Sequence, residues 1–440
     1  MTTAKRANRI GLILCLLPAL YCFVTVVYAL VKSAEYAHGT PLVIRYVVAP
    51  ALIGLFFLCA AFFLSRETRL MVGIYATALW IGLFAFEAYV TIKVLPGRLG
   101  LVGVVGEDVS VAQYQQNLPP AFTIKHLNNV MEITDLEDAI LAPIPGREML
   151  MCSVYGDPVT YRPDRYGFRN PDSVYNDDIE VMLLGDSFVE GFCLDDGRDM
   201  ASHLRTEIPQ LVNTGHRGAG PMLELATLGR YGPELKPDVT VFAFFAGNDW
   251  RNLYREKEIS WLTPVLDPGT KFGPAKHSPE QVEIASQVVQ DWWKTTTLSY
   301  KDFLRKQRII RNFFALQKTS EIIGIHYARA TKPTPVYAQV LERAADIVTQ
   351  WDGELVVVFI PPARRFQGLV SQDFIHDPLR VMVKEAADQA GLRLIDLTDA
   401  FEATDDPKSL FAADSHFNEE GAKLAASTIA KGLRNQGLMN

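Results

Sequence analysis

The chain has 440 residues, a formal net charge of −7 and 49% hydrophobic residues. Its length suggests two to three structural units, and its acidic balance argues against a nucleic-acid partner, because nucleic-acid binding normally needs a clustered basic face. Five cysteines are too few for a disulfide scaffold. Almost all of the hydrophobic excess lies before residue 95. The chain therefore divides into an apolar N-terminal region and a more polar remainder.

Three apolar segments fill residues 1–95, which we interpret as an all-α membrane region. Residues 10–31 and 46–65 carry no charge, and the third segment runs from residue 70 to residue 92 with Glu87 as its one charge. About 20 residues of helix cross a hydrocarbon core, so we predict transmembrane helices at about 10–31, 44–65 and 70–92. A cleaved signal peptide does not fit the first segment, because its apolar part is too long and no small-x-small site follows closely.

The positive charges favour a cytoplasmic N-terminus. Lys and Arg accumulate on the cytoplasmic side of membrane proteins. Here they precede the first span and fill the turn between the second and third, at Lys5, Arg6, Arg9, Arg66 and Arg69. The bias is modest, because Lys32, Arg45, Lys93 and Arg98 flank the opposite ends of the spans. Three crossings of the cytoplasmic (inner) membrane place everything after residue 95 on its extracytoplasmic, periplasmic side.

Glu87 lies about two turns from the polar end of the third predicted span. An ionisable residue inside a membrane is by default a functional candidate. Its position near the boundary favours a simpler interpretation, in which the carboxylate snorkels to the surface or faces a neighbouring helix. The sequence allows both.

Residues 96–176 are irregular, with proline-rich stretches at residues 118–120 and 143–146. We interpret them as a linker and an N-terminal extension packed on the main domain. Cys152 and Cys193 are the two cysteines of the polar part. The sequence allows either a disulfide between them in an oxidising compartment or two free thiols.

From residue 177 to residue 440, short apolar runs alternate with helical segments. The runs cover residues 179–184, 211–213, 239–245, 355–360 and 392–395. Such runs are typical of strands buried on both faces of a parallel sheet, and their alternation with helices predicts an α/β domain with helices on both faces. Residues 250–335 interrupt the alternation. We predict that they form an insertion over the carboxyl edge of the sheet, where ligands bind in open α/β folds.

Three short motifs lie at predicted strand ends or on loops. Ser187 follows Gly185 and Asp186 where the first strand meets a helix. Asn248 follows the most apolar strand, and Asp414 precedes His416 by two positions before the last helix. Alone, each motif has an ordinary explanation as a helix cap, a turn or a surface histidine. Together they offer a nucleophile, a base with a carboxylate beside it, and an amide donor.

This combination resembles the SGNH/GDSL hydrolase family, over about residues 161–433. Residues 213–218 look like the family's glycine block, and residues 236–249 look like its asparagine block. Residues 166–170 resemble a segment common in bacterial members. The resemblance implies a flavodoxin-like, three-layer α/β/α domain with a parallel sheet, and it implies nothing about the membrane region.

The resemblance also implies roles for the site residues. Ser187 is the nucleophile, His416 is the base that takes its proton, and Asp414 holds the tautomer of His416 and stabilises the charged ring. The oxyanion donors are the backbone N–H groups of Ser187 and Gly218 and the side-chain amide of Asn248.

Nothing in this chemistry requires a metal or another cofactor. Asp186, Asp249 and Asp414 are possible metal ligands, but the sequence lacks the close cluster of His and Asp that a metal site needs, and we expect none. Three further residues neighbour the motifs and either contact substrate or lie on the surface: His216, Arg217 and Trp250.

The last motif departs from the common pattern of the family. Many members place the aspartate three residues before the histidine, whereas Asp414 stands two residues before His416. This spacing resembles the branch that includes bacterial polysaccharide O-acetyltransferases of the alginate type. Hydrolysis and transfer share the acyl-enzyme, so the spacing leaves the physiological reaction open between them.

Three functions follow. The leading one is a serine esterase that removes acyl groups, in particular O-acetyl groups, from an extracytoplasmic glycan or lipid through an acyl-Ser187 intermediate. The second is an O-acyltransferase of an envelope polysaccharide, which works with a membrane partner that supplies the acyl donor. The third is a non-catalytic glycan-binding or assembly protein; the intact Ser187, Asn248, Asp414 and His416 weigh against it.

Overall fold

A computed structural model describes residues 3–33, 43–93, 109–110, 123–152, 159–276, 278–295, 297–298, 309–325, 336–370, 372–412 and 414–439. The proline-rich stretch at 118–120 lies outside these residues. The chain forms two compact units. The first comprises Met1–Pro96, Lys301–Lys332 and Gln367–Ile375, and the second comprises Gly97–Tyr300, Pro333–Phe366 and His376–Asn440.

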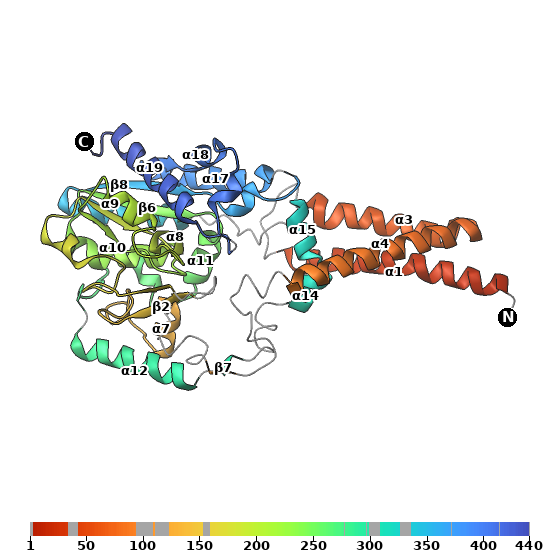
Figure 1. The fold of residues 1–440 in the computed structure, drawn as a ribbon, viewed down its shortest axis with the longest axis horizontal. Coiled ribbons are helices and arrows are strands. Elements are labelled where there is room, and N and C mark those ends of the chain that lie inside the picture. Colours follow the sequence, from red (N-terminus) through yellow and green to blue (C-terminus); the bar gives the residue numbers. More distant parts are fainter. Residues whose placement is uncertain are drawn as a thin grey trace. The chain divides into compact units, whose positions relative to one another are not determined.

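Three apolar helices make up most of the first unit (Figure 1). They are α1 (Thr3–Val31), α3 (Ala49–Phe63) and α4 (Arg66–Lys93), and a π-helical turn, η2 (Ile44–Val48), precedes α3. Among the described residues of this unit, three helices are long and apolar enough to cross a membrane: Lys5–Val31, Ile44–Phe63 and Arg66–Thr91. These helices coincide with the apolar segments of the sequence. Their length and composition suggest association with a membrane.

Small residues let these helices approach one another closely. A Cβ atom at Gly73 would lie 2.7 Å from Leu14, and one at Gly11 would lie 3.2 Å from the backbone of Leu70. Glycine at such contacts is typical of helices that pack within a membrane. Because residue 11 meets residue 70 and residue 14 meets residue 73, α1 and α4 run in the same direction.

The first unit also contains two short helices from the second half of the predicted insertion. They are α14 (Ile309–Phe314) and α15 (Gln317–Ile323), and both pack on α4. The first half of the insertion provides α11 (Asp249–Glu256), η4 (Thr263–Leu266) and α12 (Pro279–Thr295), which belong to the second unit.

A parallel five-stranded sheet, in the order β5-β4-β6-β8-β9, forms the centre of the second unit. The strands are β4 (Val181–Leu184), β5 (Leu211–Asn213), β6 (Val239–Phe245), β8 (Glu354–Ile360) and β9 (Arg393–Asp396). Each coincides with a predicted apolar run to within two residues. The strand order is that of flavodoxin-like folds, which confirms the predicted fold class.

Helices cover both faces of this sheet (Figure 1). One face carries α8 (Ser187–Glu190), α9 (Met200–Arg205) and α19 (Glu419–Asn435), and the other carries α10 (Pro221–Leu235) and α16 (Val336–Val348). Strand residues alternate between the layers: Val239 and Val241 join the core beneath α19, whereas Phe244 contacts Tyr337 of α16. Between β8 and β9 the chain forms η6 (Ala363–Phe366) and α17 (Asp373–Gln389). After β9 it forms α18 (Thr398–Glu402) and η7 (Pro407–Leu410).

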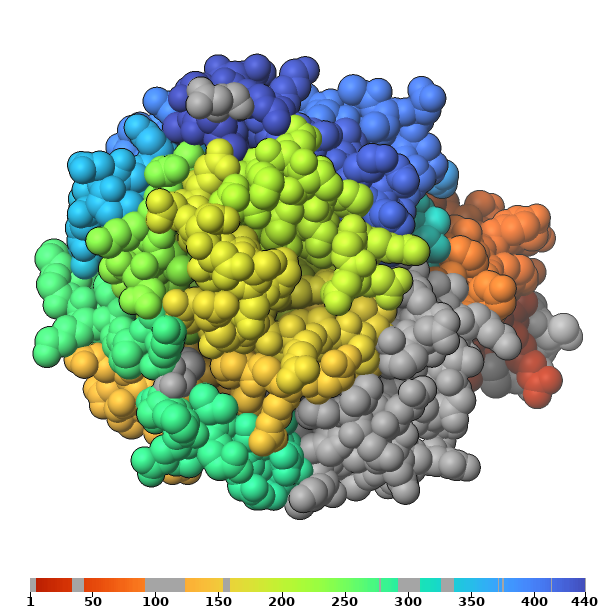
Figure 2. Space-filling model, turned by 60° about the vertical axis from the view of Figure 1, so that its left-hand side comes forward, coloured from red at the N-terminus to blue at the C-terminus, as the bar shows by residue number. Residues whose placement is uncertain are grey.

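The N-terminal extension adds small elements to the second unit. They are α7 (Ile124–Val130), the antiparallel pair β2 (Met149–Cys152) and β3 (Val159–Tyr161), and η3 (Asp172–Asn176). A further antiparallel pair joins β1 (Val109–Ser110) to β7 (Thr297–Leu298). In Figure 2, residues around 160–210, yellow to lime, cover the middle of the face in view.

Cys152 and Cys193 form a disulfide, which decides between the two alternatives that the sequence allows. The bond joins β2 to the loop after α8 across 41 positions. In the chain-entropy description, a cross-link that closes a loop of this length lowers the entropy of the unfolded chain, which raises the free energy of unfolding by about 4 kcal/mol.

Candidate active site

The carboxyl ends of β4, β5 and β6 bring three of the sequence motifs to one edge of the sheet. The chain passes from β4 to β5 on one side and then crosses to β6 on the other, so the strand order reverses beside β4. Ligands bind at such a reversal in open α/β sheets. Ser187 follows β4, Gly218 follows β5 and Asn248 follows β6.

Ser187 is the first residue of α8, at a close turn out of β4. The turn requires glycine at position 185, where a Cβ atom would lie 2.4 Å from the side chain of Val189. Asp186 caps the helix, because its Oδ1 accepts a hydrogen bond of 2.9 Å from the N–H of Phe188. The N–H of a first helical residue has no partner inside its own helix. Ser187 therefore presents both a hydroxyl and an N–H at the sheet edge.

Ser187 and His416 lie in contact although 229 positions separate them. The serine Oγ is 2.8 Å from Nε2 of the imidazole. On the other side of the ring, Nδ1 is 3.1 Å from Oδ2 of Asp414. The side chains of His416 and Asp414 are 23% and 14% exposed, so the pair is shielded but reachable. This order of groups allows a proton to pass from Oγ to Nε2 while the carboxylate holds a proton on Nδ1.

A tight loop lets Asp414 reach the ring from only two residues away. Phe411 and Phe417 form an isolated antiparallel bridge that closes the loop. Ser415, at its tip, has a φ of 78°, in the left-handed region that few non-glycine residues adopt. Oδ1 of Asp414 accepts the main-chain N–H of His416 at 3.1 Å, while Oδ2 meets the ring. The two-residue spacing therefore lets Asp414 reach both the backbone and the ring of His416.

Asn418 and Gly421, which follow this loop, have structural roles. Oδ1 of Asn418 accepts the N–H of Gly421 at 3.0 Å and so caps α19. A Cβ atom at Gly421 would lie 2.1 Å from the carbonyl oxygen of Leu410. Both residues fix the start of the helix that follows the histidine.

Two phenylalanines that follow Ser187 in the chain pack against the imidazole of His416. The ring of Phe192 lies 4.5 Å from it between centroids, and the ring of Phe188 lies 5.1 Å away. Phe188 also meets Phe417 edge-on at 4.7 Å. These contacts restrict rotation of the imidazole. Sequence reasoning missed Phe192, because nothing local links it to a residue so far along the chain.

The glycine block after β5 is hydrogen-bonded to β4 and α8, the strand and helix that flank Ser187. The N–H of Thr214 donates to the carbonyl of Leu183 at 2.8 Å, and Nδ2 of Asn213 donates to the carbonyl of Val189 at 2.8 Å. Gly218 follows with a φ of 74°, where an L side chain would be strained. The second expected oxyanion donor therefore belongs to a loop that is fixed relative to Ser187.

A buried ion pair holds the same loop to α8. Nη2 and Nε of Arg217 lie 2.9 and 3.0 Å from the carboxylate of Glu190, which also accepts the main-chain N–H of Arg217 at 2.9 Å. The guanidinium also lies over the ring of Phe192, 5.1 Å from its centroid. Burial lowers the pKa of Arg217, but Glu190 outweighs this effect and raises it. Because Arg217 precedes Gly218 directly, the pair positions the expected donor.

The structure excludes a surface position for the three residues that neighbour the motifs, His216, Arg217 and Trp250. The Arg217 side chain is 12% exposed, and His216 and Trp250 are 2% and 4% exposed. Burial lowers the pKa of His216 to about 4. His216 is therefore neutral near pH 7, with Nδ1 3.4 Å from the carbonyl oxygen of Thr214.

Asn248 directly precedes α11, and its side-chain amide interacts with Asp186 beside the serine. Burial raises the pKa of Asp186, and the N–H of Phe188, His416 and the Asn248 amide each oppose that rise. The amide therefore lies on the serine side of the sheet edge, where the third oxyanion donor is expected.

Two further carboxyl groups are buried near Asp186. Burial raises the pKa of Glu224 and of Asp249 well above the usual range, and the negative charge of Asp186 adds to both effects. Oδ2 of Asp249 accepts the N–H of Phe245 at 2.6 Å. Within the residues that the structure describes, no three His, Cys, Asp or Glu side chains are grouped so that they could hold a metal ion.

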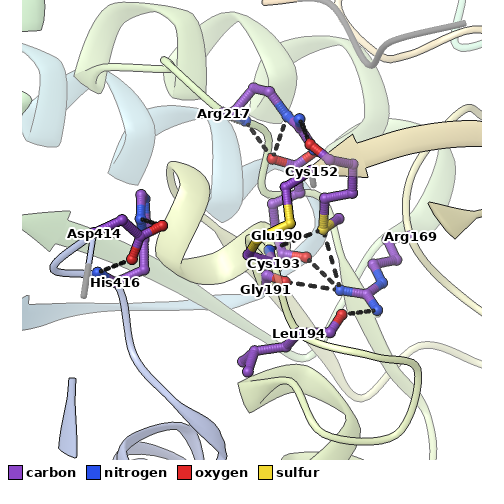
Figure 3. Close-up of a disulfide and its surroundings, with 10 residues drawn as sticks. Cys152, Arg169, Glu190, Gly191, Cys193, Leu194, Arg217, Asp414 and His416 are labelled. Atoms are coloured by element: carbon purple, nitrogen blue, oxygen red, sulfur yellow. Dashed lines mark hydrogen bonds and ion pairs between the residues drawn. A yellow bond between two sulfur atoms is a disulfide. The ribbon is translucent and has the colours of Figure 1, made fainter. Parts of the chain in front are cut away.

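The loop after α8 is fastened from two sides (Figure 3). Nη1 of Arg169 donates to the carbonyl of Gly191 at 2.9 Å, and the Cys152–Cys193 disulfide ties the loop to β2. Phe192 stands between these two attachments in the chain and packs on the imidazole of His416. Arg169 belongs to residues 166–170, so the resemblance pointed to the segment but not to this role.

Comparison with known proteins identifies one family and several similar structures. A model of the GDSL-like lipase/acylhydrolase family matches residues 183–424, more than half of the chain. No curated protein matches the chain. The structure of TesA covers 59% of this chain and 99% of its own at 13% identity and a TM-score of 0.33. A lipase/acylhydrolase from Enterococcus faecalis covers 59% and 96% at 14% identity and a TM-score of 0.32. An alpha/beta hydrolase enzyme from the metagenome of Lake Arreo, Spain, covers 60% and 96% at 15% identity and a TM-score of 0.32.

Proposed function

Because the chain belongs to the GDSL-like lipase/acylhydrolase family, we propose that it is a serine esterase that removes acyl groups, in particular O-acetyl groups, from an extracytoplasmic glycan or lipid. One observation carries the proposal. Ser187 Oγ lies 2.8 Å from Nε2 of His416, and Oδ2 of Asp414 lies 3.1 Å from the other ring nitrogen. A serine hydroxyl needs such a base to become a nucleophile.

The proposed reaction passes through an acyl-Ser187 intermediate. Oγ attacks the acyl carbonyl carbon while His416 takes the hydroxyl proton, and Asp414 stabilises the imidazolium. The N–H groups of Ser187 and Gly218 and the Asn248 amide donate to the oxyanion. When the ester C–O bond breaks, His416 returns the proton to the departing alcohol oxygen. Water then attacks the acyl-serine with the help of the same base, which releases the acid and restores the serine.

Transfer is the second candidate, and the two-residue spacing of Asp414 and His416 favours it. The first half of the reaction is unchanged. In the second half, a hydroxyl of an envelope polysaccharide replaces water as the acceptor, and a membrane partner supplies the acyl donor. Water and a sugar hydroxyl need the same base and the same oxyanion donors, so these residues support both reactions.

Intact-mass spectrometry of the purified full-length protein tests this proposal. With p-nitrophenyl acetate as the donor, we expect a transient adduct of one acetyl group on Ser187. Decay of the adduct to acetate supports hydrolysis, and its passage to an added glycan supports transfer. The exposed Ser427 of α19 provides a matched control: Ser427→Ala should acylate like the wild type, and Ser187→Ala should not acylate. Donor turnover without any adduct on Ser187 would contradict the proposal.

The proposal includes an extracytoplasmic location for the second unit. The charge pattern around the three apolar helices supports it, and so does the disulfide, because disulfides persist in oxidising compartments and are rare in the cytosol.

Thiol trapping in intact cells checks the compartment. We expect Cys152 and Cys193 to be oxidised in the cell, so reductant added before a polyethylene-glycol maleimide should increase the number of modified cysteines by two. The double variant Cys152→Ser/Cys193→Ser should show no such increase. Full modification of both thiols in the wild type without reductant would argue for a cytoplasmic domain.

A further inference from the structure

Two short helices of the first unit pack on α4, and a loop of the same unit is hydrogen-bonded to one of them. The helices are α14 and α15, from the segment before β8, and the loop comprises residues 367–370, which follow η6. All belong to the same compact unit as the three apolar helices. We call α14, α15 and residues 367–370 the cap layer.

Glu87 of α4 fastens α15. Its Oε1 accepts the N–H of Lys318 at 2.9 Å, and its Oε2 accepts the N–H and the hydroxyl of Thr319, both at 2.8 Å. The side chain is fully buried. Two of these hydrogen bonds satisfy backbone N–H groups of the first turn, which the helix itself leaves unpaired, and the third comes from the Thr319 hydroxyl. The structure therefore supports the simpler interpretation of Glu87, in which the carboxylate faces a neighbouring helix.

Aromatic contacts fasten α14 to the same end of the helices. The rings of Phe313 and Phe314 lie 5.2 and 6.2 Å from the ring of Phe84 in α4. The hydroxyl of Tyr21 in α1 donates to the carbonyl of Phe314 at 2.6 Å. The cap layer thus contacts two of the apolar helices at neighbouring levels.

Residues 367–370 are joined to α15 through the backbone. The N–H of Leu369 donates to the carbonyl of Ile322 at 3.2 Å, and the N–H of Val370 donates to that of Ile323 at 3.0 Å. Gly324 ends the helix with a φ of 90°, and a Cβ atom there would lie 2.4 Å from the carbonyl oxygen of Val370. These bonds use the last carbonyls of α15, which have no partner inside the helix.

The position of the cap layer along α4 corresponds to the edge of a bilayer. The helix begins at Arg66, and Glu87 follows 21 residues later. At about 1.5 Å per residue these residues lie about 32 Å apart along the axis, close to the thickness of a hydrocarbon core, about 30 Å. If Arg66 marks one boundary, Glu87 marks the other, and Phe84 lies just inside it.

The cap layer exposes large apolar side chains at this level. Their exposed fractions are 75% for Ile310, 58% for Phe314, 43% for Ile322, 84% for Leu369 and 47% for Val370. The spans beneath them expose apolar side chains of the same kind, among them Ile81 of α4 at 65%. Exposed apolar side chains are thus present on both the spans and the cap layer.

We propose that the cap layer lies in the headgroup region of the bilayer, with these five side chains in contact with phospholipid. Arg45 adds a positive charge at the same level, since its guanidinium lies 3.5 Å from Oγ of Ser320 in α15. Apolar side chains at the acyl boundary with cations at the phosphates are the usual arrangement of an interfacial segment. The inference rests on the membrane location of the three helices and is independent of the proposed catalysis.

The cap layer changes how the second unit is attached to the membrane. The chain passes between the two units five times, rather than once after the third span. Several segments of chain, rather than one, therefore connect the second unit to the unit that contains the apolar helices.

Tryptophan fluorescence in vesicles tests the proposal. Leu369→Trp and Ile310→Trp change exposed side chains, so neither disturbs a core. The full-length variants are reconstituted into phosphatidylcholine vesicles with ordinary or brominated acyl chains. An interfacial side chain sits about 5–10 Å into the acyl boundary, so we expect the fluorescence that the new tryptophan adds to fall by more than half in brominated lipid.

Val381→Trp in α17 is the matched control, because Val381 is 49% exposed and belongs to the second unit. Its added fluorescence should be equal in the two kinds of vesicle. The proposal is overturned if the fluorescence from positions 310 and 369 is equal in both kinds of vesicle. Iodide added to the water then separates the two alternatives: quenching by iodide indicates a side chain in water, and no quenching indicates a side chain covered by protein. Equal quenching at position 381 would also overturn it.

Discussion

Asp414→Asn is expected to lower kcat for ester hydrolysis by about 10⁴-fold while the fold is retained. Oδ1 of the asparagine can still accept the main-chain N–H of His416, so the loop keeps its shape. The amide N–H₂ then faces Nδ1 of the ring in place of Oδ2. This arrangement favours the tautomer with the proton on Nε2, which cannot accept the proton of Ser187. The fall should appear in kcat for p-nitrophenyl acetate hydrolysis, with little change in Tm.

Asp405→Asn is the matched control for this variant. Asp405 is exposed and precedes η7, so its amide variant makes the same chemical change at a distance from the imidazole. Its kcat should equal that of the wild type. If Asp414→Asn kept more than a tenth of the wild-type kcat, Asp414 would have no part in orienting His416.

The sheet could be predicted from the sequence because its signal is local. Strands buried on both faces are continuous apolar runs, and Val239–Phe245 is buried along its whole length. Helix α17 was harder to delimit. Proline favours the first turn of a helix, which would put the start near Pro378, but the helix begins at Asp373 and includes that proline. Pro378 is the sixth residue of the helix, where it removes one backbone hydrogen bond.

The geometry of the site could be anticipated only in part. The carboxyl ends of neighbouring parallel strands meet at one edge, so Ser187, Gly218 and Asn248 could be grouped from their places after strands. The contact of His416 with Ser187 could be predicted only from the family resemblance. The packing around the imidazole of His416 could not be predicted. Phe192 and the Arg217–Glu190 pair make contacts that exist only once the chain has folded, so no local sequence pattern indicates them.

The composition of the first unit could not be predicted from the sequence. The three spans are evident from length and hydropathy, but α14 and α15 belong to a segment that lies more than 200 residues after α4 begins. Their attachment depends on the pairing of Glu87 with the first turn of α15. One carboxylate in an apolar helix indicates that it has a partner, but its partner can be identified only in the folded chain.

Covalent labelling with a fluorophosphonate, followed by peptide mapping, tests the central claim most directly. The reagent forms a tetrahedral adduct that needs the same nucleophile, base and oxyanion donors as an ester. We predict one adduct, on Ser187, in the folded wild type. Ser187→Ala should remove it, and His416→Ala should slow its formation by about 10⁴-fold or more, because the hydroxyl then keeps its proton. An adduct on another residue, or labelling of Ser187 at the wild-type rate in His416→Ala, would contradict the account.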